Sequence, residues 1–262
     1  MPKNKDAKQI QKFRPICLLN VSFKILTKVL MNKLSKVVNP IISPIQTTFG
    51  KGRYIMEGVV ILHEALNSFY GDKEDALIFK VDFGKAYDKI KWPFVIQVLE
   101  LKGFPDKWCD WVMETMRGGH VGVKVNDEIG PYFKTFKGLR QGDPVFPLLY
   151  IIAIDPLHKI LDLASRKGLF HKICGRGVAV RTSLYSDDAA VFMAPIKKDI
   201  DNLATILHLF GNVTGLVTNF QKSSVVPIRC GQLNLTCILQ ALPASRASFP
   251  MKYLGLPVDK KE

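Results

Sequence analysis

The spacing of apolar residues along the chain changes from a helical to a strand-like pattern. Between Val21 and Val38 apolar residues recur every three or four positions, and Pro40 follows, which predicts an amphipathic helix. Residues 56–70 repeat this spacing and predict a second helix. The run "ALIFKVDF" (76–83) is short, apolar and ends on a carboxylate, so it predicts a strand. The first quarter of the chain is therefore expected to be helical, with a sheet starting after it.

The rest of the chain alternates between the two patterns. The further helices that we expect are residues 93–103, 105–116, 144–164 and 200–213. The expected hairpins pair residues 120–127 with 132–136 around the turn "EIGP", and "VAVRTSLYS" with "AAVFMA" around Asp187-Asp188. The segments "SSVVPI" and "YLGLPV" are expected as short single strands. These elements indicate an α+β fold, an antiparallel sheet with helices on one side and a helical, basic N-terminal part.

Charge is the composition feature that most narrows the function. The 262 residues include 37 Lys and Arg against 23 Asp and Glu, a net charge of +14, while 47% of residues are hydrophobic. That is enough apolar material for a sizeable core, and the positive charge favours a polyanion as partner. Many soluble proteins are basic, so charge alone does not identify nucleic acid as the partner. Lys24, Lys28 and Lys36 form a stripe on the first helix that is either solvated or faces phosphates.

Targeting signals and membrane spans are not expected. No uncharged apolar run reaches 18 residues, and the basic segment 1–12 lacks an apolar core, so we expect a flexible tail there and no secretory signal. The five cysteines are scattered and never spaced as C-x-x-C, which argues against zinc or a disulfide framework. An intracellular location, in nucleus or cytoplasm, fits this cysteine usage.

Three aspartates are the candidate chemical groups. Asp82 ends a predicted strand, and Asp187 and Asp188 lie at the tip of a predicted hairpin between apolar segments. Oxygen donors without histidine suit a hard cation such as Mg²⁺ or Mn²⁺, and two such ions can support phosphoryl transfer. The alternative is that the Asp187-Asp188 pair only caps a turn, as aspartate often does. The residues alone favour this simpler interpretation.

Seven segments in order then resemble the motifs of one family. They are "FRPICLLNVSFKILTKVL", "QTTFGKGRYIMEGV", "FKVDFGKAYDKIKW", "GLRQGDPVFPLLY", "YSDD", "GLVTNFQKSS" and "FPMKYLGLPV". Together they resemble the reverse transcriptase domain of LINE-type (non-LTR) retrotransposons, those of plants in particular, over residues 13–258. The resemblance implies a right-hand polymerase fold, with part of the fingers in 13–75. Residues 76–258 would form the palm, with an intervening fingers segment and the primer grip. The chain would end at 259–262 with the thumb missing.

The resemblance assigns the metal site and the catalytic groups. Asp82 and Asp187 would be the main ligands of two Mg²⁺ ions, or of Mn²⁺, with Asp188 beside them and the backbone carbonyl of Phe83 completing the set. Lys222 would protonate or stabilise the leaving pyrophosphate. For Lys222 an ordinary surface lysine is an equal alternative.

The resemblance also assigns residues to the nucleotide. Tyr87 would be the steric gate that excludes a ribose 2′-hydroxyl, although it could instead be a core aromatic at a helix start. Gln141 and Gly142 would line the incoming nucleotide, glycine allowing close backbone approach. Arg14 would contact the triphosphate, or else be structural.

Three residues would seat the primer end, and others depart from the family pattern. The primer grip would be formed by Tyr253, Leu254 and Gly255. Arg140 and Asp143 would support the nucleotide loop, while Asp88 would fix a local turn. Gly84 replaces an acidic residue, Ser186 replaces Ala, and Phe146 replaces a small Ser. Overpacking by Phe146 is expected to cost ~1–3 kcal/mol or to shift the loop.

The implied function is RNA-directed DNA polymerisation by a fragment of a longer polyprotein. The partners would be an RNA template, a DNA primer and deoxynucleoside triphosphates, with no membrane, and the oligomeric state stays open. The first alternative is a catalytically idle, nucleic-acid-binding remnant of the same domain. A second is a neighbouring polymerase type, an RNA-dependent RNA polymerase or an intron maturase.

Overall fold

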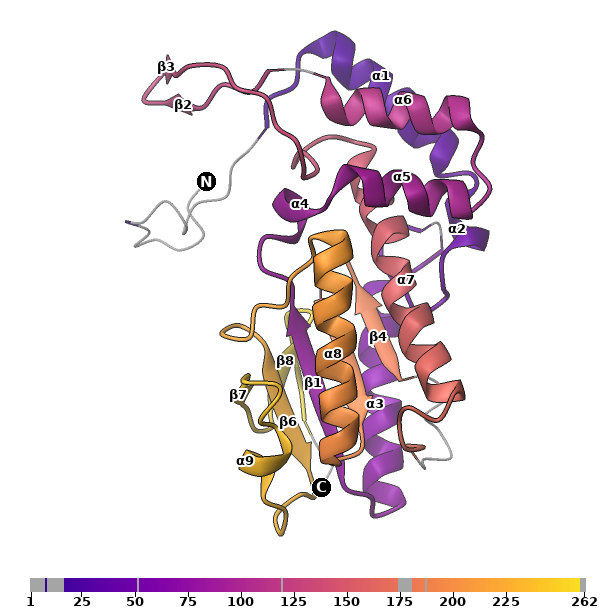
Figure 1. Ribbon diagram of the computed structural model, residues 1–262, viewed down its shortest axis with the longest axis vertical. Helices are drawn as coiled ribbons and strands as arrows, with labels where there is room; N and C mark the ends of the chain where they lie inside the picture. The colour runs from indigo at the N-terminus through magenta and orange to yellow at the C-terminus, as the bar shows by residue number, and fades with distance from the viewer. Residues whose placement is uncertain are drawn as a thin grey trace.

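The computed structural model describes residue 8 and residues 17–50, 52–118, 120–173, 181–186 and 188–259 (Figure 1). Two predicted site residues, Arg14 and Asp187, lie outside the described residues. A five-stranded sheet in the order β4-β5-β1-β6-β7 forms the centre. Its strands are β1 (Ala76–Asp82), β4 (Thr182–Tyr185), β5 (Asp188–Met193), β6 (Ser224–Ile228) and β7 (Ser245–Arg246). All neighbours pair antiparallel except β6 and β7, which run parallel.

Both faces of the sheet are covered, which corrects the expectation of helices on one side. Helices α7 (Phe146–Arg166) and α8 (Lys197–Thr214) cover the face to which Leu77 and Phe79 belong (Figure 1). Helix α3 (Ile55–Gly71) and the hairpin of β8 (Met251–Tyr253) and β9 (Leu256–Val258) cover the opposite face, where Ile78 is buried. Strand β1 is apolar at consecutive positions because alternate side chains enter two separate cores.

The smaller helices and strands surround this centre. They are α1 (Val21–Leu34), α2 (Val38–Ile41), α4 (Ala86–Lys89), α5 (Trp92–Leu101), α6 (Asp106–Arg117), α9 (Leu235–Ile238), β2 (Lys124–Val125) and β3 (Glu128–Ile129). Helices α1, α5 and α6 lie together at one end of the molecule, and the β2–β3 hairpin projects from that end (Figure 1). None of the helices in the described ranges is apolar over a length sufficient to cross a bilayer.

The first helix is shorter than predicted and buries fewer residues. Asn20 caps α1 by accepting a hydrogen bond from the backbone N–H of Phe23 at 2.8 Å. Tight turns after Leu34 end the helix, and a separate short helix follows. Only Thr27, Leu30 and Leu34 of α1 are buried, whereas Ile25, Leu26 and Val29 are exposed. The periodicity located the helix correctly, but not its full length.

Two predicted β elements form differently because each contains a tight turn. The first hairpin turns at Asn126-Asp127, with φ values of 48° and 67°, and not at residues 128–131. The segment "YLGLPV" is not one strand, because it turns at Leu254-Gly255, with φ values of 52° and 83°. Two-residue hairpin loops of type I′ have positive φ at both central positions, as here, and asparagine, aspartate and glycine adopt this conformation readily. The sequence-based boundaries were wrong here because the preference of these residues for positive φ was not taken into account.

Candidate active site

Asp82 and Asp188 face each other at one end of the sheet. Asp82 is the last residue of β1, Asp188 is the first of β5, and the register pairs them directly. Directly paired residues share a face and have Cβ atoms about 4.5–5.5 Å apart. Both residues are partly exposed, and the Asp188 side chain is 41% exposed. Lys80 lies two residues before Asp82, and its Nζ is 3.9 Å from Oδ1 of Asp188. Here a cation would offset the repulsion between two carboxylates.

The backbone of Asp82 is fixed by the segment between α8 and β6. Its N–H donates to Oγ of Ser223 at 3.0 Å, and its carbonyl accepts from the N–H of Asn219 at 2.7 Å. Ser223 is fully buried, and its hydroxyl donates to the Asn219 carbonyl at 2.8 Å. Sequence reasoning missed both residues, since their only signal was their place in the motif "GLVTNFQKSS". They position the first carboxylate through hydrogen bonds to its backbone.

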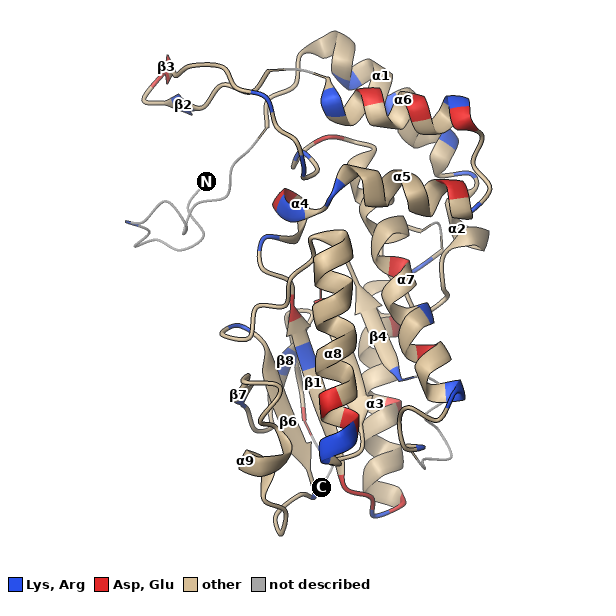
Figure 2. Cartoon of the chain, viewed as in Figure 1, with Lys and Arg blue, Asp and Glu red and all other residues tan. Residues whose placement is uncertain are grey.

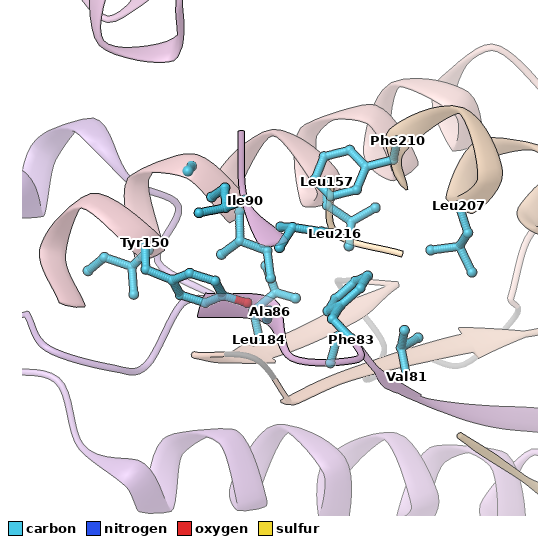
Figure 3. Close-up of a cluster of buried hydrophobic side chains, with 14 of the residues drawn as sticks. Val81, Phe83, Ala86, Ile90, Tyr150, Leu157, Leu184, Leu207, Phe210 and Leu216 are labelled. Atoms are coloured by element: carbon cyan, nitrogen blue, oxygen red, sulfur yellow. The ribbon is translucent and has the colours of Figure 1, made fainter. Parts of the chain in front are cut away.

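Two further residues of the predicted catalytic set lie beside this segment. The Phe83 ring is buried in the core, where Figure 3 shows it near Leu216 and Val81, and its backbone bridges Thr218. Lys222 has an exposed side chain, and its N–H donates to the Asn219 carbonyl at 3.1 Å. The metal role of the Phe83 carbonyl and the proton-transfer role of Lys222 stay predictions.

The side chain of Tyr87 lies partly in the core and partly at the surface, which is compatible with both a core aromatic and a steric gate. Its ring stacks on Tyr150, with ring centroids 4.5 Å apart and planes at 14°. Tyr150 is fully buried in the core under the site (Figure 3), while Tyr87 is only half-buried. The Tyr87 carbonyl accepts from the N–H of Leu139 at 2.6 Å, which ties the backbone of Tyr87 to the start of the nucleotide loop. One face of the ring is therefore held by the core, and its function as a gate stays a prediction.

The nucleotide loop is held against the N-terminal part of the chain. The Gln141 carbonyl accepts from the N–H of Cys17 at 3.3 Å. Gly142 has a φ of 100°, and a Cβ at this position would lie 3.4 Å from the Cys17 carbonyl oxygen. Glycine is therefore favoured here by the positive φ, whereas the contact with Cys17 would be an ordinary one for a Cβ. The structure brings Gln141 and Gly142 to one loop, and their contact with a nucleotide stays a prediction.

Arg140 and Asp143 support this loop from below. The Arg140 guanidinium donates to the carbonyl oxygens of Gly118 at 2.5 Å and of Thr115. Asp143 is 1% exposed and accepts from the N–H of Val145 at 3.2 Å. Burial lowers the pKa of Arg140, although the neighbouring Asp143 opposes this, and burial raises the pKa of Asp143. Both side chains form hydrogen bonds with backbone groups, which agrees with the supporting role that the resemblance implied.

Phe146, which was expected to overpack this region, packs against Arg140 in the structure. Phe146 is the first residue of α7, and its side chain is completely buried. Its ring lies 5.4 Å from the guanidinium carbon of Arg140, which is also 4.7 Å from the ring of Phe23. Arg140 is thus in contact with two aromatic rings, a favourable arrangement for a cation. The larger side chain is accommodated as part of the support for the nucleotide loop.

The predicted primer-grip residues form the end of the β8–β9 hairpin. Tyr253 is fully buried, and its hydroxyl is 3.0 Å from Oγ of Ser183 on β4. Leu254 and Gly255 are the two turn residues. Lys80 donates from Nζ to the carbonyl of Lys252 at 3.2 Å, which connects the hairpin to the strand carrying Asp82. The hairpin is therefore anchored on the same face as the two carboxylates, and its contact with a primer stays a prediction.

The titration of Tyr253 gives a test of this anchoring. Burial raises the pKa of Tyr253 to about 12 from an ordinary value of 10.0; Ser183 opposes the shift and the charge of Asp188 adds to it. Because the folded protein holds the proton more tightly, this contribution to stability is present below pH 10 and is lost as pH rises towards 12. Relative to Tyr253→Phe, the wild-type free energy of unfolding should fall by about 1.4 kcal/mol per pH unit there.

Urea unfolding of both proteins across this pH range measures the effect. A constant difference between wild type and Tyr253→Phe would contradict the buried, anchored phenol.

The donor set fits a hard metal ion. Asp82 and Asp188 contribute carboxylate oxygens on one face, which suits Mg²⁺ or Mn²⁺. Within the part of the chain that the structure describes, no group of three His, Cys, Asp or Glu side chains is positioned to hold a metal. The third predicted ligand, Asp187, lies outside that part.

Comparison with known proteins identifies the family. Residues 1–258 match the family described as "Reverse transcriptase (RNA-dependent DNA polymerase)", and the chain belongs to it. It is 25% identical over 268 residues to the "Transposon TX1 uncharacterized 149 kDa protein" of Xenopus laevis, covering 100% of this chain and 20% of that protein. It is also 25% identical to the "Retrovirus-related Pol polyprotein from type-2 retrotransposable element R2DM" of Drosophila melanogaster, covering 98% and 24%.

These relatives are much longer than the chain, which spans about a fifth to a quarter of their length. Among solved structures, the chain is similar to telomerase from Candida albicans in complex with a fragment of telomeric RNA. That match has a TM-score of 0.56 at 15% identity and covers 90% of this chain and 38% of telomerase. Telomerase from Candida tropicalis matches with a TM-score of 0.52 at 14% identity, covering 89% and 35%. The reverse transcriptase family and an α+β, polymerase-like fold are thus confirmed.

Proposed function

We propose that this chain is the fingers and palm part of an RNA-directed DNA polymerase of a non-LTR retrotransposon, with 13–75 as fingers and 76–258 as palm. It extends a DNA primer by deoxynucleotides on an RNA template. The observation that carries the proposal is the direct pairing of Asp82 with Asp188 on one face at the end of the sheet. Family membership and the similarity to proteins of transposable elements support it. A plant element as source rests on the resemblance of the motifs.

The chain's own residues provide a fixed site for this reaction. Asp82, Asp187 and Asp188, with the Phe83 carbonyl, would hold two Mg²⁺ ions, which when bound lower the pKa of the primer 3′-hydroxyl and offset charge on the phosphates. Ser223 and Asn219 keep the Asp82 backbone in place, so its carboxylate is preorganised. Arg14 and Lys222 would bind the triphosphate and the leaving pyrophosphate.

Charge supports a nucleic acid as the partner. The net charge is +14, and Figure 2 shows Lys and Arg distributed over the molecule, with Asp and Glu interspersed on α6 and α8. A basic surface attracts phosphate backbones at long range, and this attraction falls steeply with salt. The primer would lie along the β8–β9 hairpin, and Gln141 and Gly142 would line the incoming nucleotide.

Primer extension tests the proposal. Purified protein is incubated with an RNA template, an annealed DNA primer, deoxynucleotides and Mg²⁺, and binding to the same hybrid is measured separately. Extension that depends on Mg²⁺ is the expected result. Salt-dependent binding without any extension would instead identify an idle nucleic-acid-binding remnant.

Tyr87 should set the preference for deoxynucleotides. Its ring is backed by Tyr150, so it can resist a ribose 2′-hydroxyl without moving. We expect Tyr87→Ala to lower the deoxynucleotide to ribonucleotide ratio of kcat/KM by about 10–200-fold. Tyr87→Phe, which keeps the ring and its stacking, should preserve selectivity. The ratio is insensitive to partial unfolding of a variant, and an unchanged ratio in Tyr87→Ala would rule out the gate.

A further inference from the structure

The connection between β4 and β5 needs support from elsewhere in the chain. It consists of Ser186 and Asp187, immediately before Asp188. Ser186 has a φ of 52°, a left-handed conformation that residues other than glycine adopt at a cost in free energy. Ser186 is only 8% exposed, so water is a poor replacement for a lost partner of its N–H.

This support comes from two side chains 140 and 138 positions earlier in the sequence. The Ser186 N–H donates to Oγ1 of Thr48 at 2.7 Å and lies 3.1 Å from Oε1 of Gln46. The Thr48 hydroxyl in turn donates to Oε1 of Gln46 at 2.7 Å. Gln46 is 0% exposed and Thr48 is 4% exposed. The three groups thus form a closed, buried set of hydrogen bonds around one backbone N–H.

The segment that carries these side chains is itself held firmly. Gln46 forms a parallel bridge with Leu184, and the Thr47 N–H donates to the Leu184 carbonyl at 3.1 Å. The Arg53 guanidinium donates to the carbonyl oxygens of Ser43, at 2.6 Å, and of Gln46. Gln46 and Thr47 are therefore bound to β4 at the edge of the sheet, and this segment cannot easily shift away from Ser186.

Burying Gln46 is poorly explained by stability alone. In the described part of the chain its Nε2 atom is buried without a hydrogen-bond partner, which is costly. Its Oε1 atom, by contrast, is used by both Ser186 and Thr48. A buried polar atom without a partner calls for an explanation, and the contact of Oε1 with the Ser186 turn provides one.

We propose that Gln46 and Thr48 are positioning residues for the candidate active site. By holding Ser186 in its left-handed conformation, they fix the start of β5 so that Asp188 stays opposite Asp82. This inference rests on the proposed polymerase function. The inference adds two residues to the proposed site. They touch neither substrate nor metal, and they act through the backbone of the turn.

The test compares three threonine variants of the whole chain. Thr48→Val removes the hydroxyl at nearly constant shape, Thr48→Ser keeps it, and Thr47→Val is the matched control. The Thr47 hydroxyl is 3.5 Å from the Leu184 carbonyl and makes no bond to Ser186. The affinity for Mn²⁺ is measured by electron paramagnetic resonance, and kcat and KM are measured by primer extension.

Thr48→Val should weaken Mn²⁺ binding and should lower kcat by about tenfold to a hundredfold, with the KM for deoxynucleotide nearly unchanged. Thr48→Ser should restore both quantities, and Thr47→Val should leave both at the wild-type value. Gln46→Met, which removes the Oε1 acceptor, is a second variant with the same expected direction.

Three results would overturn the positioning role. They are equal losses in Thr48→Val and Thr47→Val, no rescue by Thr48→Ser, or losses that follow Tm across the series. If the wild type binds Mn²⁺ but extends no primer, the proposed function fails, and the Mn²⁺ affinities alone decide whether Thr48 positions the turn.

Discussion

Replacing Asp82 by asparagine should abolish primer extension. The substitution keeps the size of the side chain and its backbone bonds to Ser223 and Asn219, but removes the charge that faces Asp188. A metal ion at such a site is worth several kcal/mol of transition-state stabilisation, so kcat should fall by about a thousandfold or more. The measurement is single-turnover extension of a labelled primer on RNA.

Asp88→Asn is the matched control for this prediction. Asp88 lies six positions further along on α4, its side chain is exposed, and its backbone N–H donates to the Lys85 carbonyl at 3.0 Å. The same change of charge there should leave kcat within about twofold, because the side chain is exposed and the substitution keeps its size and its backbone bond. Equal losses in the two variants would show that general charge, and not the paired carboxylates, controls activity.

Asp155→Ala should lower the free energy of unfolding more than any other substitution proposed for this chain. Asp155 lies on α7 and is completely buried, and it accepts from the Ser43 N–H at 2.6 Å and from Nζ of Lys102 at 2.8 Å. Burial lowers the pKa of Lys102, and the hydrogen bond and charge of Asp155 oppose that shift. Removing the carboxylate leaves a buried ammonium group without its counter-charge, which costs about 3–5 kcal/mol.

Urea unfolding of Asp155→Ala and Asp162→Ala tests whether the loss of stability is specific to the buried carboxylate or follows removal of any carboxylate from this helix. Asp162 is on the same helix and pairs with Arg166, but both side chains of that pair are exposed, 39% and 74%. A surface pair of this kind contributes about 0–1 kcal/mol. Similar losses in the two variants would contradict a structural role for the buried pair. Because the Asp155 carboxylate holds Ser43, three residues before Gln46, the Asp155 variant should also weaken Mn²⁺ binding.

Helices were predictable where burial is periodic, and turns were less so. Helices α3 and α5 to α8 begin and end within a few residues of their predicted limits, because their apolar stripes face a core. The covering of both sheet faces could have been inferred from the uninterrupted apolar run 76–79, which is typical of a strand buried on both sides. The two misplaced turns depended on positive φ values at Asp127 and Leu254.

The candidate site was predictable only in part, and for a physical reason. The resemblance indicated Asp82 and Asp188, but no local pattern specifies the register that places them opposite each other. Gln46, Thr48 and Ser223 act through hydrogen bonds to residues 138 to 141 positions away. Contacts of this kind arise from the packing of segments far apart in sequence, so periodicity and residue type do not reveal them.

The most direct test of RNA-directed polymerisation is to change one template base. Two RNA templates that differ only at the first position beyond the primer are extended with Mg²⁺ and one deoxynucleotide at a time. The account predicts that the nucleotide added follows the RNA base in each case, and that Asp82→Asn adds none. Addition that ignores the template base, or that persists in Asp82→Asn, would contradict it.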